Sequence, residues 1–255
     1  MDSVELAVEF RDVSYRLSDG REILKHLSFT VARGEILVLL GRSGSGKTTA
    51  LKLVNRLADN SAGEVLVESR ATRDWNPIQL RRHIGYAIQE VGLFPHYTVE
   101  RNIALVPSIE NWPAEKMHTR VEELIGLLGL DPDVASRYPH QLSGGQRQRV
   151  GVARALAADP PILLMDEPFG ALDPLTRSDL QREFLALQQR LKKTVLFVTH
   201  DLNEALFLGT RIALLEQGRL VWLGSKEEFL MSSEPLVVKY MEAFRSPFDR
   251  LRGKS

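Results

Sequence analysis

Residues 36–49 have the sequence ILVLLGRSGSGKTT, the strongest local signal in this chain. Residues 36–40 are apolar throughout, which is typical of a strand buried on both faces of a sheet. A glycine-rich turn follows, and residues 47–58 have the pattern of a helix. This order brings free backbone N–H groups and the positive end of a helix to one point. The stretch therefore predicts a binding site for phosphate groups.

Residues 41–48 fit the pattern G-x-x-x-x-G-K-[ST], the P-loop motif. Lys47 is expected to reach the β- and γ-phosphates of a nucleotide, and the Thr48 hydroxyl is expected to ligate Mg²⁺. The alternative is a chance glycine turn before a helix, and the buried strand before the motif argues against it. The expected nucleotide contacts are Gly41, Arg42, Ser43, Gly44, Ser45, Gly46, Lys47, Thr48 and Thr49.

A second apolar run, Ile162-Leu-Leu-Met-Asp166-Glu167, ends in two carboxylates. A buried strand here delivers Asp166 to the carboxyl edge of the sheet, where ligands bind in open α/β folds. Asp166 is expected to hold Mg²⁺ through its water shell, and Glu167 to orient or deprotonate the attacking water. A strand that simply meets solvent has the same local pattern. Because a P-loop occurs in the same chain, we favour the functional interpretation, a P-loop nucleotidase.

Strands alternate with helices along most of the chain, which predicts an α/β fold with a mainly parallel sheet. Residues 4–31 alternate apolar and polar side chains around a turn, as antiparallel strands do. We therefore expect a P-loop NTPase core with an N-terminal antiparallel β subdomain and an inserted helical subdomain. The expected limits are about 1–89 and 156–230 for the core, about 90–155 for the helical subdomain, and 231–255 for a short C-terminal extension.

The individual elements follow from local patterns. A strand pair around Gln217-Gly218 is a predicted hairpin, and Leu180, Phe184, Leu187 and Leu191 share one face of a predicted helix. Further strands are expected at 63–68, 84–88 and 194–199, and helices at 99–106, 114–128 and 146–158. The last ten residues are polar and are expected to be loose.

The segment Leu142-Ser-Gly-Gly-Gln146 opens the last of those predicted helices. Ser143 is a natural N-cap, and Gly144 and Gly145 leave backbone N–H groups open to an anion. This is a second phosphate-binding helix start in one chain. Taken locally, the same residues are equally an ordinary helix cap.

The chain resembles the ABC ATPase family, because GRSGSGKT, LSGGQ and ILLMDE occur in the family's order over about residues 4–230. The resemblance implies an ATPase domain over residues 1–230. It implies that Tyr15 stacks on adenine, that Gln89 senses Mg²⁺ and contacts the transporter, and that His200 contacts the γ-phosphate. It also implies that Ala171-Leu172-Asp173 lies at a dimer seam. Taken alone, each of these residues has a structural explanation, such as Asp173 as a helix cap before Pro174.

The family's mechanism uses two subunits arranged head to tail around two ATP molecules with Mg²⁺. The resemblance therefore implies that Ser143, Gly144, Gly145 and Gln146 act on the nucleotide of a partner copy. It implies a homodimer that moves integral membrane permease subunits, docked near Gln89 and the helical subdomain, and that works indirectly with a substrate-binding protein. ATP would close the dimer, and hydrolysis would open it.

Residues 80–103 and 52–57 look like the importer branch, and most like ATPases that take up glycine betaine, choline or other quaternary amines. Importers of methionine, other amino acids or a lipid remain open. Related glycine betaine ATPases often carry a C-terminal regulatory pair of domains, and the few residues after the core lead us to expect no such regulation here.

The overall composition argues against several kinds of partner and chemistry. Lys plus Arg and Asp plus Glu are both 33, and a nucleic-acid partner is not expected without a basic excess. The absence of cysteine excludes disulfides and thiolate chemistry. No signal peptide and no apolar run of about 20 residues occur, so we expect a cytoplasmic protein held at the inner face of the membrane by a partner.

Two other classes stay open. A soluble ABC protein of translation or DNA repair usually carries two cassettes or a long insert. An unrelated P-loop kinase or GTPase has no use for LSGGQ, and a GTPase should show an Asn/Thr-Lys-x-Asp motif, which the chain lacks.

Overall fold

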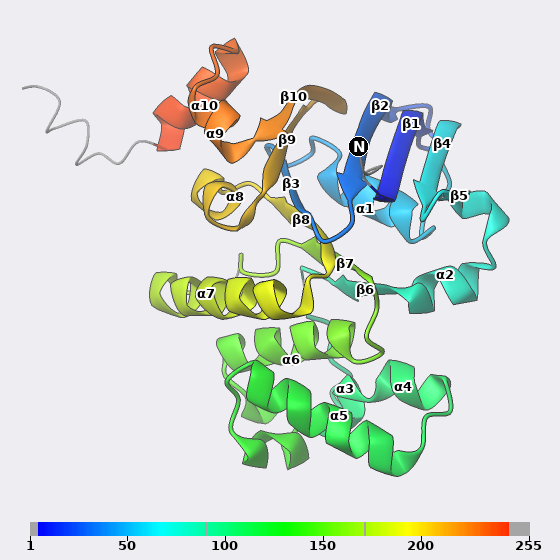
Figure 1. The fold of residues 1–255 in the computed structure, drawn as a ribbon, viewed down its shortest axis with the longest axis vertical. Coiled ribbons are helices and arrows are strands. Elements are labelled where there is room, and N and C mark those ends of the chain that lie inside the picture. The colour runs from blue at the N-terminus through cyan, green and yellow to red at the C-terminus, as the bar shows by residue number, and fades with distance from the viewer. Residues whose placement is uncertain (1–4, 90, 171, 245–255) are drawn as a thin grey trace, which may run out of the picture.

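The computed structural model describes residues 5–89, 91–170 and 172–244 of the chain, which form two sheets with helices around them (Figure 1). The larger sheet has the strand order β10-β9-β3-β8-β7-β6. Its neighbours pair in parallel except β9 and β10, which form the predicted hairpin. The strands are β3 (Ile36–Leu40), β6 (Ile84–Ala87), β7 (Ile162–Asp166), β8 (Thr194–Thr199), β9 (Arg211–Glu216) and β10 (Arg219–Ser225).

Strand β3 lies in the middle of this sheet and is buried on both faces. Ile36, Val38 and Leu40 belong to one hydrophobic cluster, and Leu37 and Leu39 belong to a second cluster on the opposite face. Successive side chains of a strand point to opposite faces, so an unbroken apolar run is needed where both faces are covered. The strand predicted at residues 36–40 is confirmed.

The second sheet is antiparallel and has the order β2-β1-β4-β5. It consists of β1 (Leu6–Arg16), β2 (Glu22–Ala32), β4 (Ala62–Val67) and β5 (Arg70–Ala71). The rings of Phe10 and Phe29 stack across β1 and β2 with centroids 4.4 Å apart. The sheet shares a hydrophobic cluster with one face of β3 and with helix α1 (Lys47–Val54). The predicted α/β fold with an N-terminal antiparallel part is confirmed.

Helix α1 is shorter than the helix predicted at residues 47–58, and that prediction was wrong at its end. Arg56 has a positive φ of 51°. The N–H of Leu57 donates to the carbonyl of Lys52 at 2.8 Å, and the N–H of Arg56 donates to the carbonyl of Leu53 at 3.3 Å. This pattern closes a helix by satisfying its last carbonyls. Apolar residues continue at helical spacing past Val54, but the backbone leaves the helical conformation there.

Between β6 and β7 the described chain is helical, and these helices gather at the lower end of the molecule in Figure 1. They are α3 (Val99–Ile103), α4 (Leu105–Ile109), α5 (Ala114–Leu127) and α6 (Gly144–Leu156), with short 3₁₀ helices at Pro132–Ser136 and Pro139–Gln141. The single helix predicted at residues 99–106 was wrong. Pro107 has no N–H to donate to the carbonyl of Ile103, so the helix breaks at Ala104.

The remaining helices are α2 (Pro77–His83), α7 (Pro174–Leu191), α8 (Leu202–Leu208), α9 (Lys226–Leu230) and α10 (Pro235–Phe244), with a 3₁₀ helix at Thr72–Asp74. Leu180, Phe184 and Leu187 are buried on α7, as predicted. Sequence reasoning missed α2, α8, α9 and α10. Among the helices of the described residues, none is both long enough and apolar enough to span a membrane. The predicted loose tail, residues 246–255, lies outside the described residues.

Candidate functional site

The P-loop connects β3 to α1 and wraps around its own lysine. The ammonium group of Lys47 donates to the carbonyls of Gly41 at 2.7 Å and Arg42 at 2.9 Å. Lys47 as a whole residue is only 4% exposed. This burial lowers the pKa of Lys47, and the carboxylates of Glu167 and Asp166 oppose that effect. Phosphate oxygens are stronger acceptors than these carbonyls, so the lysine is available to an anion.

Two glycines of the loop are required by space and by backbone conformation. A Cβ on Gly46 would lie 2.5 Å from Leu24 Cδ2, and its φ of +100° disfavours any L side chain. A Cβ on Gly41 would lie 2.4 Å from the carbonyl oxygen of Leu215. Between them, the Ser45 hydroxyl is buried without a hydrogen-bond partner among the described residues. The loop therefore forms a tight cradle, and its Ser45 hydroxyl can still form a hydrogen bond with a ligand.

The carboxyl end of β7 meets the start of α1. The Thr48 hydroxyl donates to Asp166 Oδ1 at 2.9 Å, and the Tyr86 hydroxyl donates to Asp166 Oδ2 at 3.3 Å. Burial raises the pKa of Asp166, although both hydrogen bonds oppose the shift. Burial and the carboxylate of Asp166 also raise the pKa of Tyr86. Sequence reasoning missed Tyr86, which β6 places beside β7.

Glu167 and His200 face each other from the ends of two adjacent strands. His200 Nδ1 lies 3.1 Å from Glu167 Oε2, and the two side chains are 59% and 17% exposed. Glu167 has a positive φ of 45°, which is uncommon for a residue with a side chain. Such conformations concentrate at functional sites, where the surrounding structure holds them in place. The N–H of Glu167 is fixed by the carbonyl of Val198 at 3.0 Å.

Lys47, Thr48, Glu167 and His200 border one cavity of about 770 Å³, a size usual for small-molecule sites, whereas the predicted residues Gly41, Ser45 and Asp166 are not part of its lining. Its lining contains the predicted residues Arg42, Ser43, Gly44, Gly46, Lys47, Thr48, Thr49, Gln89, Glu167 and His200. It also contains Ile23 of β2 and four residues of α10, Lys239, Tyr240, Ala243 and Phe244, which sequence reasoning missed. The signal for α10 was available, because Val237, Tyr240 and Phe244 recur at helical spacing after Pro235.

Other predicted residues lie away from this cavity. Ser143 caps α6, accepting from the N–H of Gln146 at 3.2 Å, while Gln146 Oε1 accepts from the N–H of Ser143. Asp173 caps α7 by accepting from the N–H of Thr176 at 3.1 Å. Tyr15 is partly buried on β1 opposite Leu24. None of the signature residues Ser143, Gly144, Gly145 and Gln146 lines the cavity, and neither does Tyr15 or Asp173. Ala171 lies outside the described residues.

The site has the chemistry to hold a nucleotide with Mg²⁺. The Gly41–Thr48 cradle and the free Ser45 hydroxyl suit phosphate oxygens. Thr48 and Asp166 offer adjacent oxygen ligands. The described residues contain no group of three His, Cys, Asp or Glu side chains suited to a metal. Mg²⁺ in nucleotide sites takes one or two protein oxygens and fills its other positions from phosphate and water, so the donor set fits.

Fold and site together define a P-loop nucleoside-triphosphate-binding domain. A family model described as ABC transporter matches residues 24–170, more than half of the chain. The chain therefore belongs to the ABC transporter family, which confirms the resemblance found in the sequence.

Known relatives agree with this assignment. The choline transport ATP-binding protein OpuBA of Bacillus subtilis is 48% identical over 219 residues, covering 86% of this chain and 58% of that protein. The osmoprotectant import ATP-binding protein OsmV of Salmonella typhimurium is 52% identical over 206 residues, covering 80% of this chain and 54% of that protein. The chain thus spans less than two thirds of the length of both.

Among solved structures, the ATP-binding cassette MJ0796 in a dimeric post-hydrolysis state bound to ADP and Pi has a TM-score of 0.78 and 34% identity. The alignment covers 86% of this chain and 98% of that one. The fold of the described residues is therefore similar to that of this ATP-binding cassette.

Proposed function

We propose that this chain is the ATP-binding and hydrolysing subunit of an ABC importer, working as a dimer that drives a membrane permease. One observation carries the proposal: Lys47, Thr48, Glu167 and His200 border one cavity, although they come from three separate parts of the chain. In the proposed ATP site, Lys47 binds phosphate and Thr48 binds the metal ion. Glu167 activates water, and His200 contacts the γ-phosphate.

The proposed chemistry follows from their positions. Lys47 and the loop amides bind the β- and γ-phosphates and leave the γ-phosphate facing Glu167 and His200. Glu167 orients the attacking water and takes its proton, while His200 holds the Glu167 carboxylate in place through the 3.1 Å contact. Thr48 and Asp166, with Gln89, would hold Mg²⁺. When bound, that ion neutralises charge on the phosphates.

The signature residues complete the site from a second copy in this proposal. Ser143 is exposed and caps α6, whose first N–H groups have no partner in the same helix. A γ-phosphate at that helix start gains amide hydrogen bonds and the helix dipole. Asp173 lies nearby at the start of α7, where Gly145 packs so closely that a Cβ on it would clash with Thr176 Cγ2 at 2.7 Å. Both helix starts would face the partner copy.

The proposed cargo is a quaternary amine such as glycine betaine or choline. This rests on the names of the relatives and on the residues 80–103 and 52–57. The ATPase itself does not select the cargo. A permease, held near Gln89 and the helical segment at the inner face of the membrane, and a substrate-binding protein would do so.

Phosphate release by the purified chain tests the ATPase, with Mg²⁺ and with EDTA. We expect turnover only with Mg²⁺. Uptake of labelled glycine betaine, choline and methionine, measured in cells with and without this chain at high osmolarity, tests the cargo. Loss of methionine uptake with unchanged betaine and choline uptake would overturn the cargo and leave the ATPase standing.

A further inference from the structure

Two turns hold the pair Glu167 and His200, and each turn begins at the end of a strand. The first follows β7, where the N–H of Gly170 donates to the carbonyl of Glu167 at 3.1 Å. The second follows β8, where the N–H of Asp201 donates to the Thr199 hydroxyl at 3.0 Å. The relative position of the two turns sets how the two side chains meet.

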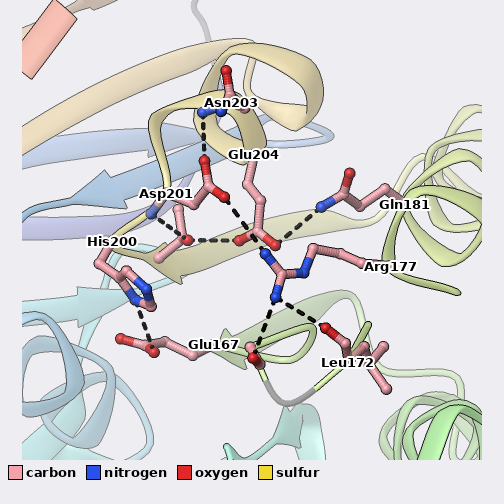
Figure 2. A network of polar contacts seen from close by, with 10 residues as sticks. Glu167, Leu172, Arg177, Gln181, His200, Asp201, Asn203 and Glu204 are labelled. Atoms are coloured by element: carbon pink, nitrogen blue, oxygen red, sulfur yellow. Dashed lines mark hydrogen bonds and ion pairs between the residues drawn. The ribbon is translucent and has the colours of Figure 1, made fainter. Parts of the chain in front are cut away.

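Arg177, in the first turns of α7, contacts both turns (Figure 2). Its Nη2 donates to the carbonyl of Leu172 at 3.0 Å and to that of Gly170 at 3.4 Å. Its Nη1 lies 3.7 Å from Asp201 Oδ2 in an ion pair. The planar guanidinium thus has one side on the turn after Glu167 and the other on the turn after His200.

The second turn is held in place by several hydrogen bonds. Asp201 Oδ1 accepts from the N–H of Asn203 at 2.8 Å and so caps α8. Glu204 is 4% exposed and accepts from the Thr199 hydroxyl at 2.6 Å. It also accepts from Gln181 Nε2, one turn along α7 from Arg177, at 3.0 Å. These bonds attach the His200 turn to α7, so a shift of α7 moves both turns.

We infer that Arg177 is a positioning residue, which fixes the Glu167 turn against the His200 turn and so sets the geometry of water attack. Figure 2 shows these contacts together: Arg177 with Leu172 and with Asp201, and His200 with Glu167. A guanidinium fork suits this task, because it donates in two directions within one plane, whereas a lysine donates from a single point. The inference rests on the proposed ATPase.

The test is a kinetic comparison of Arg177→Gln with the wild-type chain. We expect kcat for ATP to fall about ten-fold or more, with KM and the affinity for a non-hydrolysable ATP analogue within about two-fold. Arg177→Lys should recover part of kcat. Arg182→Gln is the matched control, because Arg182 lies on the same helix, its side chain is 68% exposed, and its hydrogen bond and ion pair are with Ser178 and Asp179 on that helix. It should keep wild-type kcat.

Asp201→Asn supplies a second variant, since asparagine still caps a helix but loses the charge that faces Arg177. It should lower kcat, and the double variant should be no slower than Arg177→Gln alone. Wild-type kcat in Arg177→Gln, or equal losses of kcat, analogue binding and melting temperature, would overturn the inference. Glu167→Gln is run beside these variants: if it turns over ATP normally, the proposed function fails, whatever Arg177 does.

Discussion

His200 Nδ1 lies 3.1 Å from Glu167 Oε2, across the carboxyl ends of β8 and β7. The two strands pair in parallel, so their last residues necessarily lie side by side at the sheet edge where ligands bind. Removing the charge of Glu167 should therefore stop ATP hydrolysis without disturbing the phosphate cradle Gly41–Thr48.

Glu167→Gln should bind ATP, hydrolyse it at less than about one hundredth of the wild-type rate, and accumulate as a dimer. Glutamine keeps the shape of the side chain but cannot take a proton from water. Size exclusion with ATP and Mg²⁺, together with phosphate release, measures both effects. Glu227→Gln, an exposed carboxylate on α9, is the control. An ATP-loaded variant that stays monomeric contradicts the dimer model.

Lys47→Ala should abolish hydrolysis and weaken ATP binding at least ten-fold. Lys47 provides the only buried cation bordering the cavity among the described residues, and alanine leaves the β- and γ-phosphates without it. Fluorescent nucleotide titration and phosphate release provide the readout. Lys52→Ala, an exposed lysine on the same helix, should behave as wild type. Normal turnover in Lys47→Ala would remove this residue from the site.

Ser143→Arg should block hydrolysis while ATP binding to a single subunit stays within about two-fold of wild type. Ser143 is exposed, and it is not among the residues that line the cavity of its own subunit. Ser225→Arg is a matched control, because Ser225 caps α9 with the same reciprocal bonds to a residue three positions on. Equal loss of binding and hydrolysis in Ser143→Arg would assign the residue to its own subunit's pocket.

Glu204→Gln should raise the free energy of unfolding by about 1 kcal/mol at pH 8, with a smaller gain near pH 5. Burial raises the pKa of Glu204, which outweighs its hydrogen bonds to Thr199 and Gln181 and the charge of Arg177. A raised pKa in the folded state stabilises the protein at low pH, and that stabilisation is lost as pH rises through the folded pKa. Urea unfolding at several pH values measures the difference. A variant less stable than wild type at pH 8 contradicts the prediction.

The motifs, and the strands and helices that carry them, could be predicted from the amino-acid sequence. The P-loop with its strand and helix, the run 162–167, and the helix start at Ser143 depend on neighbouring residues and on backbone conformation, which local patterns encode. The strand 36–40 and the hairpin at Gln217-Gly218 were predicted for the same reason. Where helices end was predicted less well, because Arg56 and Pro107 act through single backbone groups that periodicity does not reveal.

Which of these residues come into contact depends on the three-dimensional packing. Thr48 contacts Asp166 across 118 positions of sequence, and Tyr86 joins them because β6 lies beside β7. Helix α10 lines the cavity, and Arg177 connects two turns that are distant in the chain. Such contacts follow from strand order and helix packing. Strand order and helix packing depend on how all the buried faces fit together, and this cannot be read from a local sequence pattern.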